Sequence, residues 1–302
     1  MVNIKKYKKV AILSGGISDE YEISKLSATA VYKVLKNKYN CKLINVGNDC
    51  INLIKKLKAF HPDIIFNCLH GYFGEDGQIQ SILNLLGFPY THSGVLASSM
   101  SMDKKKSKVF FKGLKISVPD EIDPLNKKLN TFPIITKPIN GGSSNGIKII
   151  QSKDELNKFI KKVGINLHKF IFEEFINGRE ITVGIINNKV YGIMEIKFNS
   201  ALYDYNKKYI NVAEHIINPK LSKKIRDELK KASIIAHNAI GCNCVSRVDF
   251  KYDQKRKKIF LLEINTQPGL TNNSLLPEMA KEKITFFELC EILINNPTCE
   301  KY

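Results

Sequence analysis

Two side chains with oxygen ligands stand at the end of an apolar segment in the last quarter of the chain. The segment reads FLLEIN, and a Pro-Gly turn follows after two more residues. Because alternate side chains of a strand share a face, we expect Glu263 and Asn265 to point one way, and Leu262 and Ile264 to point into a core. Carboxylate and amide oxygens suit Mg²⁺, especially Mg²⁺ carried by a nucleoside triphosphate. The segment predicts either a magnesium site or a strand that simply ends in polar residues.

The preceding segment, CVSRVDFKY, adds a second polar pair, because Arg247 and Asp249 share one face of a predicted strand. The short polar link DQKRKK between the two segments predicts a hairpin. A turn centred near Lys255 would place Asp249 opposite Glu263 and Arg247 opposite Asn265. A slip of one residue would turn one strand's face away from the other. In the predicted register, three oxygen ligands and a guanidinium group gather on one surface.

The glycine-rich segment TKPINGGSSNG puts Lys137 at a strand end, before a loop of glycines and serines. Such a loop can close over phosphates with backbone N–H and hydroxyl donors, although it lacks the Gly-Lys-Ser/Thr ending of a P-loop. The alternative is a mobile hairpin loop. Lys137 and Lys104 are the first candidates for phosphate partners, and the alternative for either is a surface lysine.

Two further segments carry polar groups suited to a nucleotide site. In IFEEFINGREITVGII, a strand, a Gly turn and a second strand, Glu173 could accept a hydrogen bond from an adenine amino group and Glu180 could hold a ribose hydroxyl. A solvated acidic patch is the alternative. The segment LYDYNKKY suits an active-site flap better than a core strand, because each buried tyrosine hydroxyl needs a partner.

The elements that position these residues fall into three predicted regions. Residues 1–92 alternate strands and helices, which predicts a three-layer α/β domain with a parallel sheet. Residues 93–172 predict an α+β lobe with an antiparallel sheet, and residues 173–302 a second α+β lobe. Strands are expected over residues 9–13, 42–46, 63–68, 132–136, 147–150 and 170–174, besides the hairpin. Helices are expected over residues 24–35, 50–60, 77–86, 102–114, 153–163, 222–240 and 285–294.

Length and composition limit the class of protein. With 302 residues, the chain can bury a large core in two or three domains. The net charge of +18 would permit a basic nucleic-acid-binding protein, which is the remote alternative. The lysines are scattered, however, and Asn and Ile are also abundant, so codon bias is the favoured explanation of the high lysine content. No apolar run reaches the length of a membrane span, and the first one stops at Ser14, too short for a signal peptide. Seven dispersed cysteines favour reduced thiols in a cytoplasmic protein.

Eight motifs resemble, in order, those of the D-alanine–D-alanine ligase family of the ATP-grasp superfamily. One such motif would be weak evidence, but the series covers nearly the whole chain. The resemblance implies an ATP-grasp architecture, in which two α+β lobes enclose ATP. The motifs are SGGISDEYEIS, LHGYFGEDGQIQ, PYTHSGVLASSMSMDKKKSK, TKPINGGSSNG, EEFINGREITV, YDYNKKY, SRVD and LLEINTQPGLTNNSLLP.

The resemblance also implies a reaction, which serves peptidoglycan precursor synthesis. ATP would phosphorylate the carboxylate of one D-alanine, and the amine of a second D-alanine would attack the acyl phosphate. Two Mg²⁺ or Mn²⁺ ions would be held by Asp249, Glu263 and Asn265, with Glu263 bridging them. The family is commonly dimeric, so the resemblance implies a homodimer, and it implies neither nucleic-acid nor membrane binding. The residues that match the family's nucleotide contacts are Lys104, Lys137, Ser144, Glu173, Phe175, Ile176 and Glu180.

The remaining matches concern the two amino-acid substrates. Glu22 matches the carboxylate that anchors the first ammonium group, and Ser143 and Tyr209 match its partners in a lid that excludes water. Arg247 and the backbone N–H of Gly269 match an oxyanion site. The family's residues that bind the carboxylate of the second substrate correspond to Lys208, Ser274 and Leu275. His70 lies near the first substrate in the family, either as a proton acceptor or as a structural histidine.

One departure and one rival accompany this resemblance. The family's phosphate loop usually has Glu where this chain has Gly141, which removes a possible loop anchor. The closest alternative is a ligase of the same family that uses D-lactate or D-serine as second substrate. Tyr209 matches the dipeptide-forming type, whereas lactate-using relatives tend to carry His in this loop.

Overall fold

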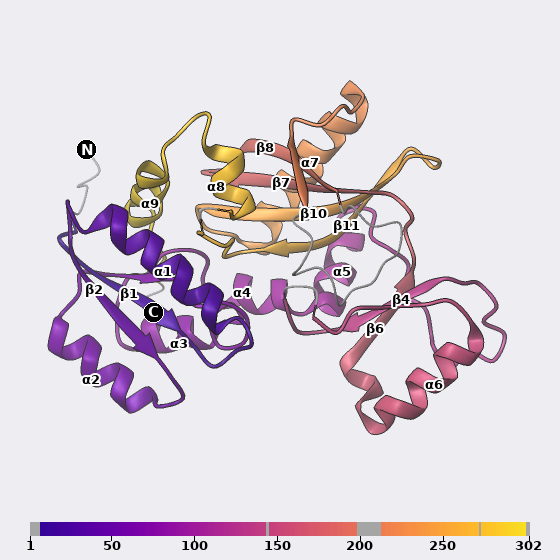
Figure 1. Cartoon of the computed structure of the whole chain (residues 1–302), viewed down its shortest axis with the longest axis horizontal. Coiled ribbons are helices and arrows are strands. Elements are labelled where there is room, and N and C mark those ends of the chain that lie inside the picture. The colour runs from indigo at the N-terminus through magenta and orange to yellow at the C-terminus, as the bar shows by residue number, and fades with distance from the viewer. Residues whose placement is uncertain (1–6, 143–144, 198–212, 272, 300–302) are drawn as a thin grey trace.

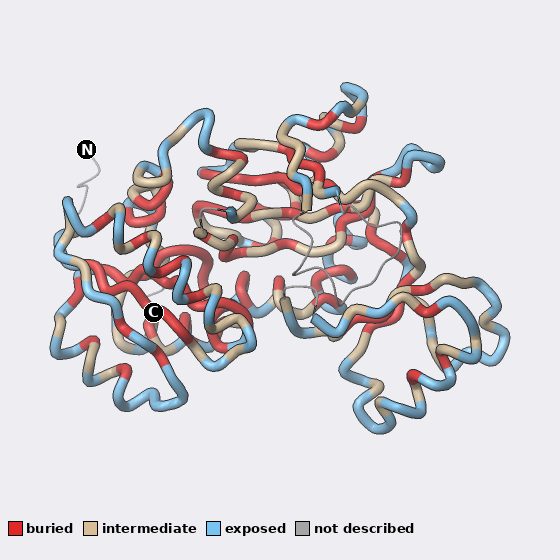
Figure 2. Tube along the Cα trace, in the orientation of Figure 1, coloured by how far each residue is buried: buried red, intermediate tan, exposed pale blue. Residues whose placement is uncertain are grey.

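The computed structural model describes residues 7–142, 145–197, 213–271 and 273–299. Figure 1 shows an N-terminal region on the left, a large sheet in the upper middle and a smaller sheet at the lower right. Buried backbone, red in Figure 2, follows the strands of these sheets and the inner faces of the helices beside them. In the described part of the chain, no helix combines the length and the apolar character needed to cross a membrane.

The N-terminal region is a three-layer α/β unit, as predicted. Its sheet has the strand order β2-β1-β3 and is parallel throughout. In β1, Val10 and Ile12 pack toward α1 and α9, whereas Ala11 and Leu13 pack toward α2 and α3. Because α9 comes from the C-terminal end of the chain, the last helix completes the first domain. The elements are β1 (Lys9–Gly15), α1 (Tyr21–Leu35), β2 (Asn40–Val46), α2 (Cys50–Phe60), β3 (Ile64–Asn67), α3 (Gln78–Leu85) and α9 (Phe286–Asn295).

The smaller sheet is antiparallel, also as predicted, with the order β5-β4-β6. Helix α6 covers it and buries Leu156 and Phe159 against Ile134 and Phe172. Strand β6 belongs to this sheet, so the domain boundary predicted at residue 172 falls inside a strand. The elements are β4 (Ile134–Pro138), β5 (Lys148–Ile150), α6 (Lys153–Val163), a 3₁₀ helix (Gly164–Lys169) and β6 (Phe170–Glu174).

The larger sheet is antiparallel, with the order β11-β10-β7-β8-β9. Helix α7 packs on one face together with α4 and α5, which come from the predicted central region. Helix α8 lies against β7 and β8, where Gly184 and Gly192 leave room for Leu276 and Met279. The elements are α4 (Val95–Met102), α5 (Lys104–Gly113), β7 (Arg179–Ile186), β8 (Lys189–Lys197), β9 (Glu214–Ile217), α7 (Lys223–Ile240), β10 (Val245–Asp253), β11 (Lys258–Asn265) and α8 (Leu275–Ala280).

Local sequence explains where several helices begin. The hydroxyls of Ser152 and Ser222 accept hydrogen bonds from backbone N–H groups in the first turns of α6 and α7. Thr285 and Glu288 form a reciprocal capping box at the start of α9. Such caps satisfy N–H groups that have no partner inside the helix, which is why the helices predicted near these residues begin within one residue of the expected positions.

Candidate active site

The β10–β11 hairpin has the register that the sequence predicted. Asp249 pairs with Glu263, and Arg247 pairs with Asn265. A β-bulge between these pairs and the turn shifts the register by one residue. Leu262 is the extra residue of the bulge and is only half-buried, while Leu261 and Ile264 lie in the core. The expectation that Leu262 points into the core is therefore wrong, because the bulge reverses the alternation of faces.

Asp249 is the centre of the polar groups on this surface. Its carboxylate accepts hydrogen bonds from Thr182 Oγ1 at 2.6 Å and Asn265 Nδ2 at 3.0 Å, and it pairs with Arg247 Nη2 at 2.8 Å. Burial alone would raise the pKa of Asp249, but the charge of Arg247 and these hydrogen bonds hold the pKa below its ordinary value. Burial disfavours the charged form of Arg247, yet Asp249 raises the Arg247 pKa. Both groups are therefore charged at neutral pH.

The donor set of the hairpin fits a magnesium ion bound together with phosphates. Among the described residues, no three His, Cys, Asp or Glu side chains form a group that could hold a metal alone. The hairpin instead offers the carboxylates of Asp249 and Glu263 and the amide oxygen of Asn265, whose nitrogen is the atom bonded to Asp249. Magnesium usually takes one or two carboxylates and completes its shell with water and substrate phosphates. These residues match that requirement.

Lys104 connects this hairpin with the glycine-rich loop. Its ammonium group lies 3.5 Å from Glu263 Oε2 and donates a hydrogen bond to the carbonyl oxygen of Gly141 at 2.5 Å. Lys104 is buried, with 7% of its surface exposed, which argues against the alternative of an ordinary surface lysine. Gly141 has φ +144°, which side-chain-bearing residues rarely adopt. Ser143 and Ser144 lie outside the described residues.

A buried charge cluster of Lys108, Lys137 and Glu173 lies beside Lys104. Lys137 Nζ is 2.7 Å from Glu173 Oε2, and Lys108 Nζ donates to Glu173 Oε1. Each of the three is at most 5% exposed. Burial would raise the pKa of Glu173, but the charges of Lys137 and Lys108 lower it. Burial and then the charge of Lys137 lower the pKa of Lys108 to about 7.

Sequence reasoning missed Lys108, although a signal existed. Lys104 and Lys108 are four residues apart in α5 and therefore lie on one face of the helix. The other residues predicted to contact the nucleotide follow Glu173 in the sequence. Ile176 is buried, Phe175 is half-buried, and Glu180 pairs with Lys251 at 3.2 Å.

The acidic residue that faces the site from the N-terminal region is Glu20, not Glu22. Glu22 lies in the first turn of α1 with its side chain 77% exposed, and it pairs with Lys25 at 3.9 Å. The carboxylate of Glu20 lies so close to the glycine-rich loop that a Cβ added at Gly142 would be 3.3 Å from Glu20 Oε1. The expectation for Glu22 is corrected accordingly, because the helix begins at residue 21 and turns Glu22 outward.

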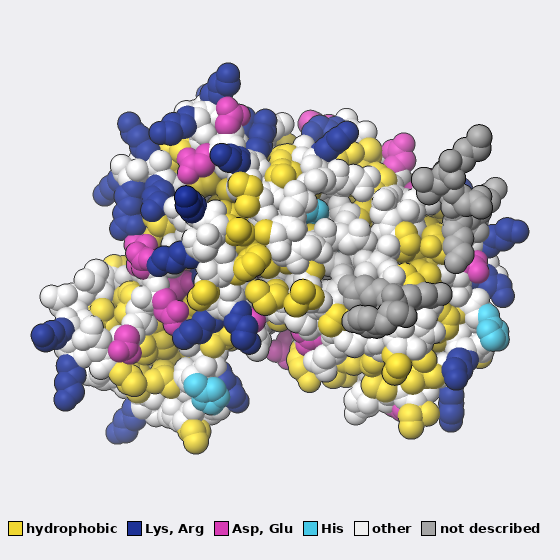
Figure 3. Space-filling model, turned by 180° about the vertical axis from the view of Figure 1, so that it is seen from behind, with side chains coloured by type: hydrophobic (Ala, Val, Ile, Leu, Met, Phe, Trp, Pro, Cys, Tyr) yellow, Lys and Arg dark blue, Asp and Glu magenta, His cyan; other side chains and the backbone are white. Residues whose placement is uncertain are grey.

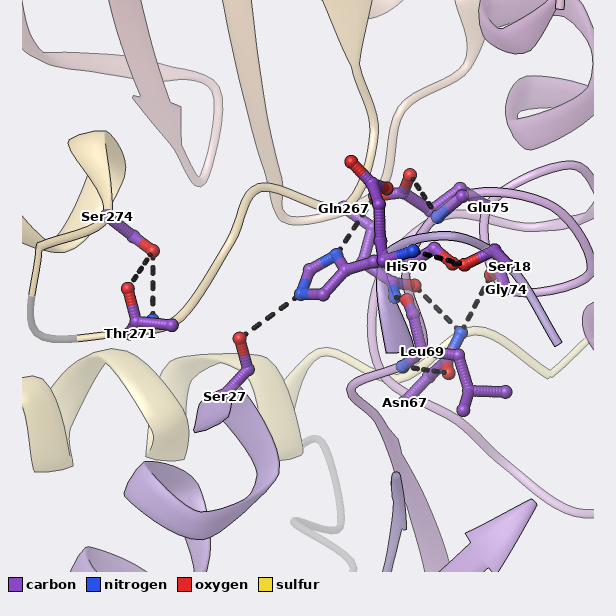
Figure 4. A network of polar contacts seen from close by, with 12 residues as sticks. Ser18, Ser27, Asn67, Leu69, His70, Gly74, Glu75, Gln267, Thr271 and Ser274 are labelled. Carbon is purple, nitrogen blue, oxygen red and sulfur yellow. Dashed lines mark hydrogen bonds and ion pairs between the residues drawn. The ribbon is translucent and has the colours of Figure 1, made fainter. Parts of the chain in front are cut away.

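His70 is buried, with 6% of its surface exposed, in the loop after β3. Figure 4 shows its ring between Ser27 Oγ, 3.1 Å from Nε2, and Glu75 Oε1, 3.3 Å from Nδ1. Burial alone would lower the pKa of His70, but the hydrogen bond and charge of Glu75, together with the charge of Glu20, raise it. The neighbouring carboxylates therefore favour the charged form of the ring, and the contacts with Ser27 and Glu75 fix its orientation.

The turn after β11 brings the oxyanion and second-substrate candidates together. Ser274 Oγ accepts a hydrogen bond from the Thr271 N–H at 2.9 Å, as Figure 4 shows; Ser274 stands directly before α8, and its side chain caps no N–H group of that helix. A Cβ added at Gly269 would lie 2.8 Å from Ser274 Oγ. Leu275 is half-buried as the first residue of α8. Lys208 and Tyr209 lie outside the described residues.

On the face drawn in Figure 3, basic side chains are mixed with acidic ones. A nucleic-acid interface would need clustered basic residues. The hydrogen bonds and ion pairs of the candidate site lie instead around the β10–β11 hairpin.

Comparisons with known proteins agree with this geometry. Family models described as the D-Ala–D-Ala ligase N-terminus and C-terminus match residues 50–93 and 98–295. D-alanine–D-alanine ligases of Pelagibacter ubique and Rhodospirillum rubrum are 43% and 37% identical to this chain; each alignment covers 97% of this chain and 99% of the relative.

Solved structures support the predicted ATP-grasp architecture. A D-alanine–D-alanine ligase from Bacillus anthracis, complexed with ATP, has a TM-score of 0.81 and 31% identity, covering 96% of this chain and 97% of that one. The VanG D-Ala:D-Ser ligase from Enterococcus faecalis has a TM-score of 0.78 and 28% identity, covering 96% and 99%. By motif order, fold and full-length similarity, the chain belongs to the D-alanine–D-alanine ligase family.

Proposed function

We propose that this chain joins two D-alanine molecules to D-alanyl-D-alanine at the expense of ATP, for peptidoglycan precursor synthesis. The observation that carries the proposal is the β10–β11 register, which sets Arg247, Asp249, Glu263 and Asn265 on one surface beside Lys104. That surface combines hard oxygen ligands with fixed positive charges, as a phosphoryl-transfer site requires.

In the first step, the carboxylate of one D-alanine attacks the terminal phosphorus of ATP and ADP leaves. Lys104 and Lys137 are suited to hold the phosphates. Mg²⁺ or Mn²⁺, held by Asp249, Glu263 and Asn265, would neutralise charge on the phosphate oxygens when bound. Glu20 is suited to hold the ammonium group of the first D-alanine, since its carboxylate borders both the loop at Gly71 and the glycine-rich loop.

In the second step, the amine of the second D-alanine attacks the acyl phosphate carbonyl, and phosphate leaves from the tetrahedral intermediate. Arg247 and the N–H of Gly269 are suited to stabilise the negative oxygen that forms only in this intermediate. The ring of His70 is suited to lie near the first substrate, where the Glu75 carboxylate orients it. Ser274 is suited to bind the second carboxylate. We further propose a homodimer in the cytoplasm.

The test is phosphate release from ATP in the presence of single amino acids. We expect release that requires both D-alanine and Mg²⁺ and is absent with L-alanine. Mixtures of D-alanine with D-serine or D-lactate, followed by product analysis, identify the second substrate. A mixed product formed in preference to D-alanyl-D-alanine would favour the related ligases, and phosphate release independent of D-alanine would contradict the proposal.

A further inference from the structure

A buried glutamine bridges the two parts of the candidate site that come from opposite ends of the chain. Gln267 follows β11, with 3% of its surface exposed. Its amide oxygen accepts a hydrogen bond from Asn67 Nδ2 at 2.8 Å, and its amide nitrogen donates to the carbonyl oxygen of Leu69. Figure 4 shows Gln267 reaching across to this N-terminal loop.

The residues at the two ends of this bridge adjoin the reacting groups. Leu69 directly precedes His70, and Gln267 stands two residues before Gly269. A single side chain therefore connects the peptide before the histidine with the turn that carries the oxyanion N–H. No role was predicted for Gln267, because its partners lie about 200 residues away in sequence.

The N-terminal side of the bridge is itself rigid. Asn67 Oδ1 accepts from Leu69 N at 3.1 Å, and Asn67 Nδ2 also donates to the Gly74 carbonyl at 3.1 Å. Gly74 packs so closely on Leu69 that a Cβ there would be 2.6 Å from the Leu69 Cβ. Because these contacts tie Leu69 to its neighbours, we expect a displacement at Leu69 to be passed on to His70.

The chemistry of the bridge requires a carboxamide. Gln267 uses one donor and one acceptor in a buried place, where an unmatched polar group is costly. Glutamate would keep the shape but place an oxygen against the Leu69 carbonyl. Methionine would keep the approximate volume but satisfy neither partner.

We propose that Gln267 is a positioning residue for the ligation: by holding Asn67 and Leu69, it fixes the Gly269 turn relative to the His70 loop. The inference rests on the proposed function, since both groups must reach the same tetrahedral intermediate. Displacement by about 1 Å can cost on the order of a hundredfold in rate. The step most exposed to such displacement is attack by the second amine, because it joins groups from both parts of the chain.

The experiment compares Gln267→Met and Gln267→Glu with a matched variant, Gln80→Met. Gln80 is also buried and its amide donates to the Gly74 carbonyl at 2.9 Å, but this contact stays within the N-terminal region. Phosphate and dipeptide are measured separately at saturating ATP and D-alanine. For both Gln267 variants we expect kcat for dipeptide to fall at least tenfold, with KM for ATP within threefold of wild type.

The ratio of phosphate to dipeptide gives a readout that loss of stability alone would not change. If the amine is misplaced, water attacks the acyl phosphate, releasing phosphate and regenerating D-alanine, so the ratio rises above one. We expect Gln80→Met to lower thermal stability while the ratio and kcat stay at wild-type values.

The inference is overturned if active Gln267 variants keep the wild-type kcat and ratio, or if Gln80→Met loses both equally. Should the first two variants not fold, Gln267→Asn, which keeps the amide but is one methylene shorter, is held to the same criteria. Absence of D-alanine-dependent activity in the wild-type enzyme would instead contradict the proposed function.

Discussion

Replacing Glu173 by glutamine should strongly destabilise the protein, because the change leaves two buried lysines without their shared counter-charge. Lys108 and Lys137 both contact the Glu173 carboxylate, and all three side chains are almost fully buried. Removing one partner of a buried ion pair costs about 3–5 kcal/mol. A loss of about 3 kcal/mol corresponds to more than a hundredfold increase in the unfolded fraction.

Lys108→Met is the matched control, because it removes a charge from the same cluster but leaves Lys137 paired with Glu173 at 2.7 Å. We expect this variant to be far less destabilised than Glu173→Gln, since Lys137 and Glu173 stay paired and no buried charge is left without a partner. The free energy of unfolding is measured by urea denaturation, followed by circular dichroism. Equal stabilities of Glu173→Gln and Lys108→Met would refute the reasoning.

The same cluster predicts a pH dependence. The pKa of Lys108 is lowered from 10.5 to about 7 in the folded protein, so the unfolded state binds more protons between these values. The free energy of unfolding should therefore rise as the pH increases from about 7 to the unfolded pKa of the lysine. The same contribution is lost as the pH falls back toward 7. Lys108→Met removes this contribution. Parallel pH profiles of the wild type and this variant between pH 7 and 10 would contradict the assignment.

Three further predictions concern the site. Glu263→Gln should abolish turnover yet leave the melting temperature nearly unchanged, because the side chain is 32% exposed at a strand end; a large loss of stability would indicate a structural role. Gly269→Ala should lower kcat at least tenfold, since the new Cβ would lie 2.8 Å from Ser274 Oγ, and an unchanged kcat would count against the oxyanion role. Glu75→Gln should lower the pKa of His70, as followed by NMR of its ring protons. Because Glu75 raises the pKa of His70, the stability that their contact adds should be complete below the unfolded pKa of the ring and should fade as the pH rises through the folded pKa. An unchanged His70 pKa in the Glu75→Gln variant would refute this prediction.

Much of the site could be predicted because its residues share single elements or adjacent strands. The hairpin link is short and polar, so a hairpin that brings Asp249 close to Glu263 could be predicted. The exact pair is set by the bulge, because the pairing beside the turn, with Phe250 opposite Leu261, would otherwise place Asp249 opposite Leu262. The bulge at Leu262 could not be predicted, since alternation alone gives no sign of an extra residue. The predicted fold class was likewise confirmed, with a parallel sheet followed by antiparallel ones, although β6 crosses the predicted boundary at residue 172.

The sequence by itself determined the family, the order of the elements and the groups that a strand or loop presents locally. Its motifs state which residue types are present, and periodicity states which of them share a face. Only the tertiary structure decided that Glu20 rather than Glu22 faces the glycine-rich loop, and that Lys108 shares Glu173 with Lys137. It also decided that Gln267 holds the peptide before His70. These contacts depend on how separate elements pack, and the energy of packing is not encoded in the spacing of residues within any one of them.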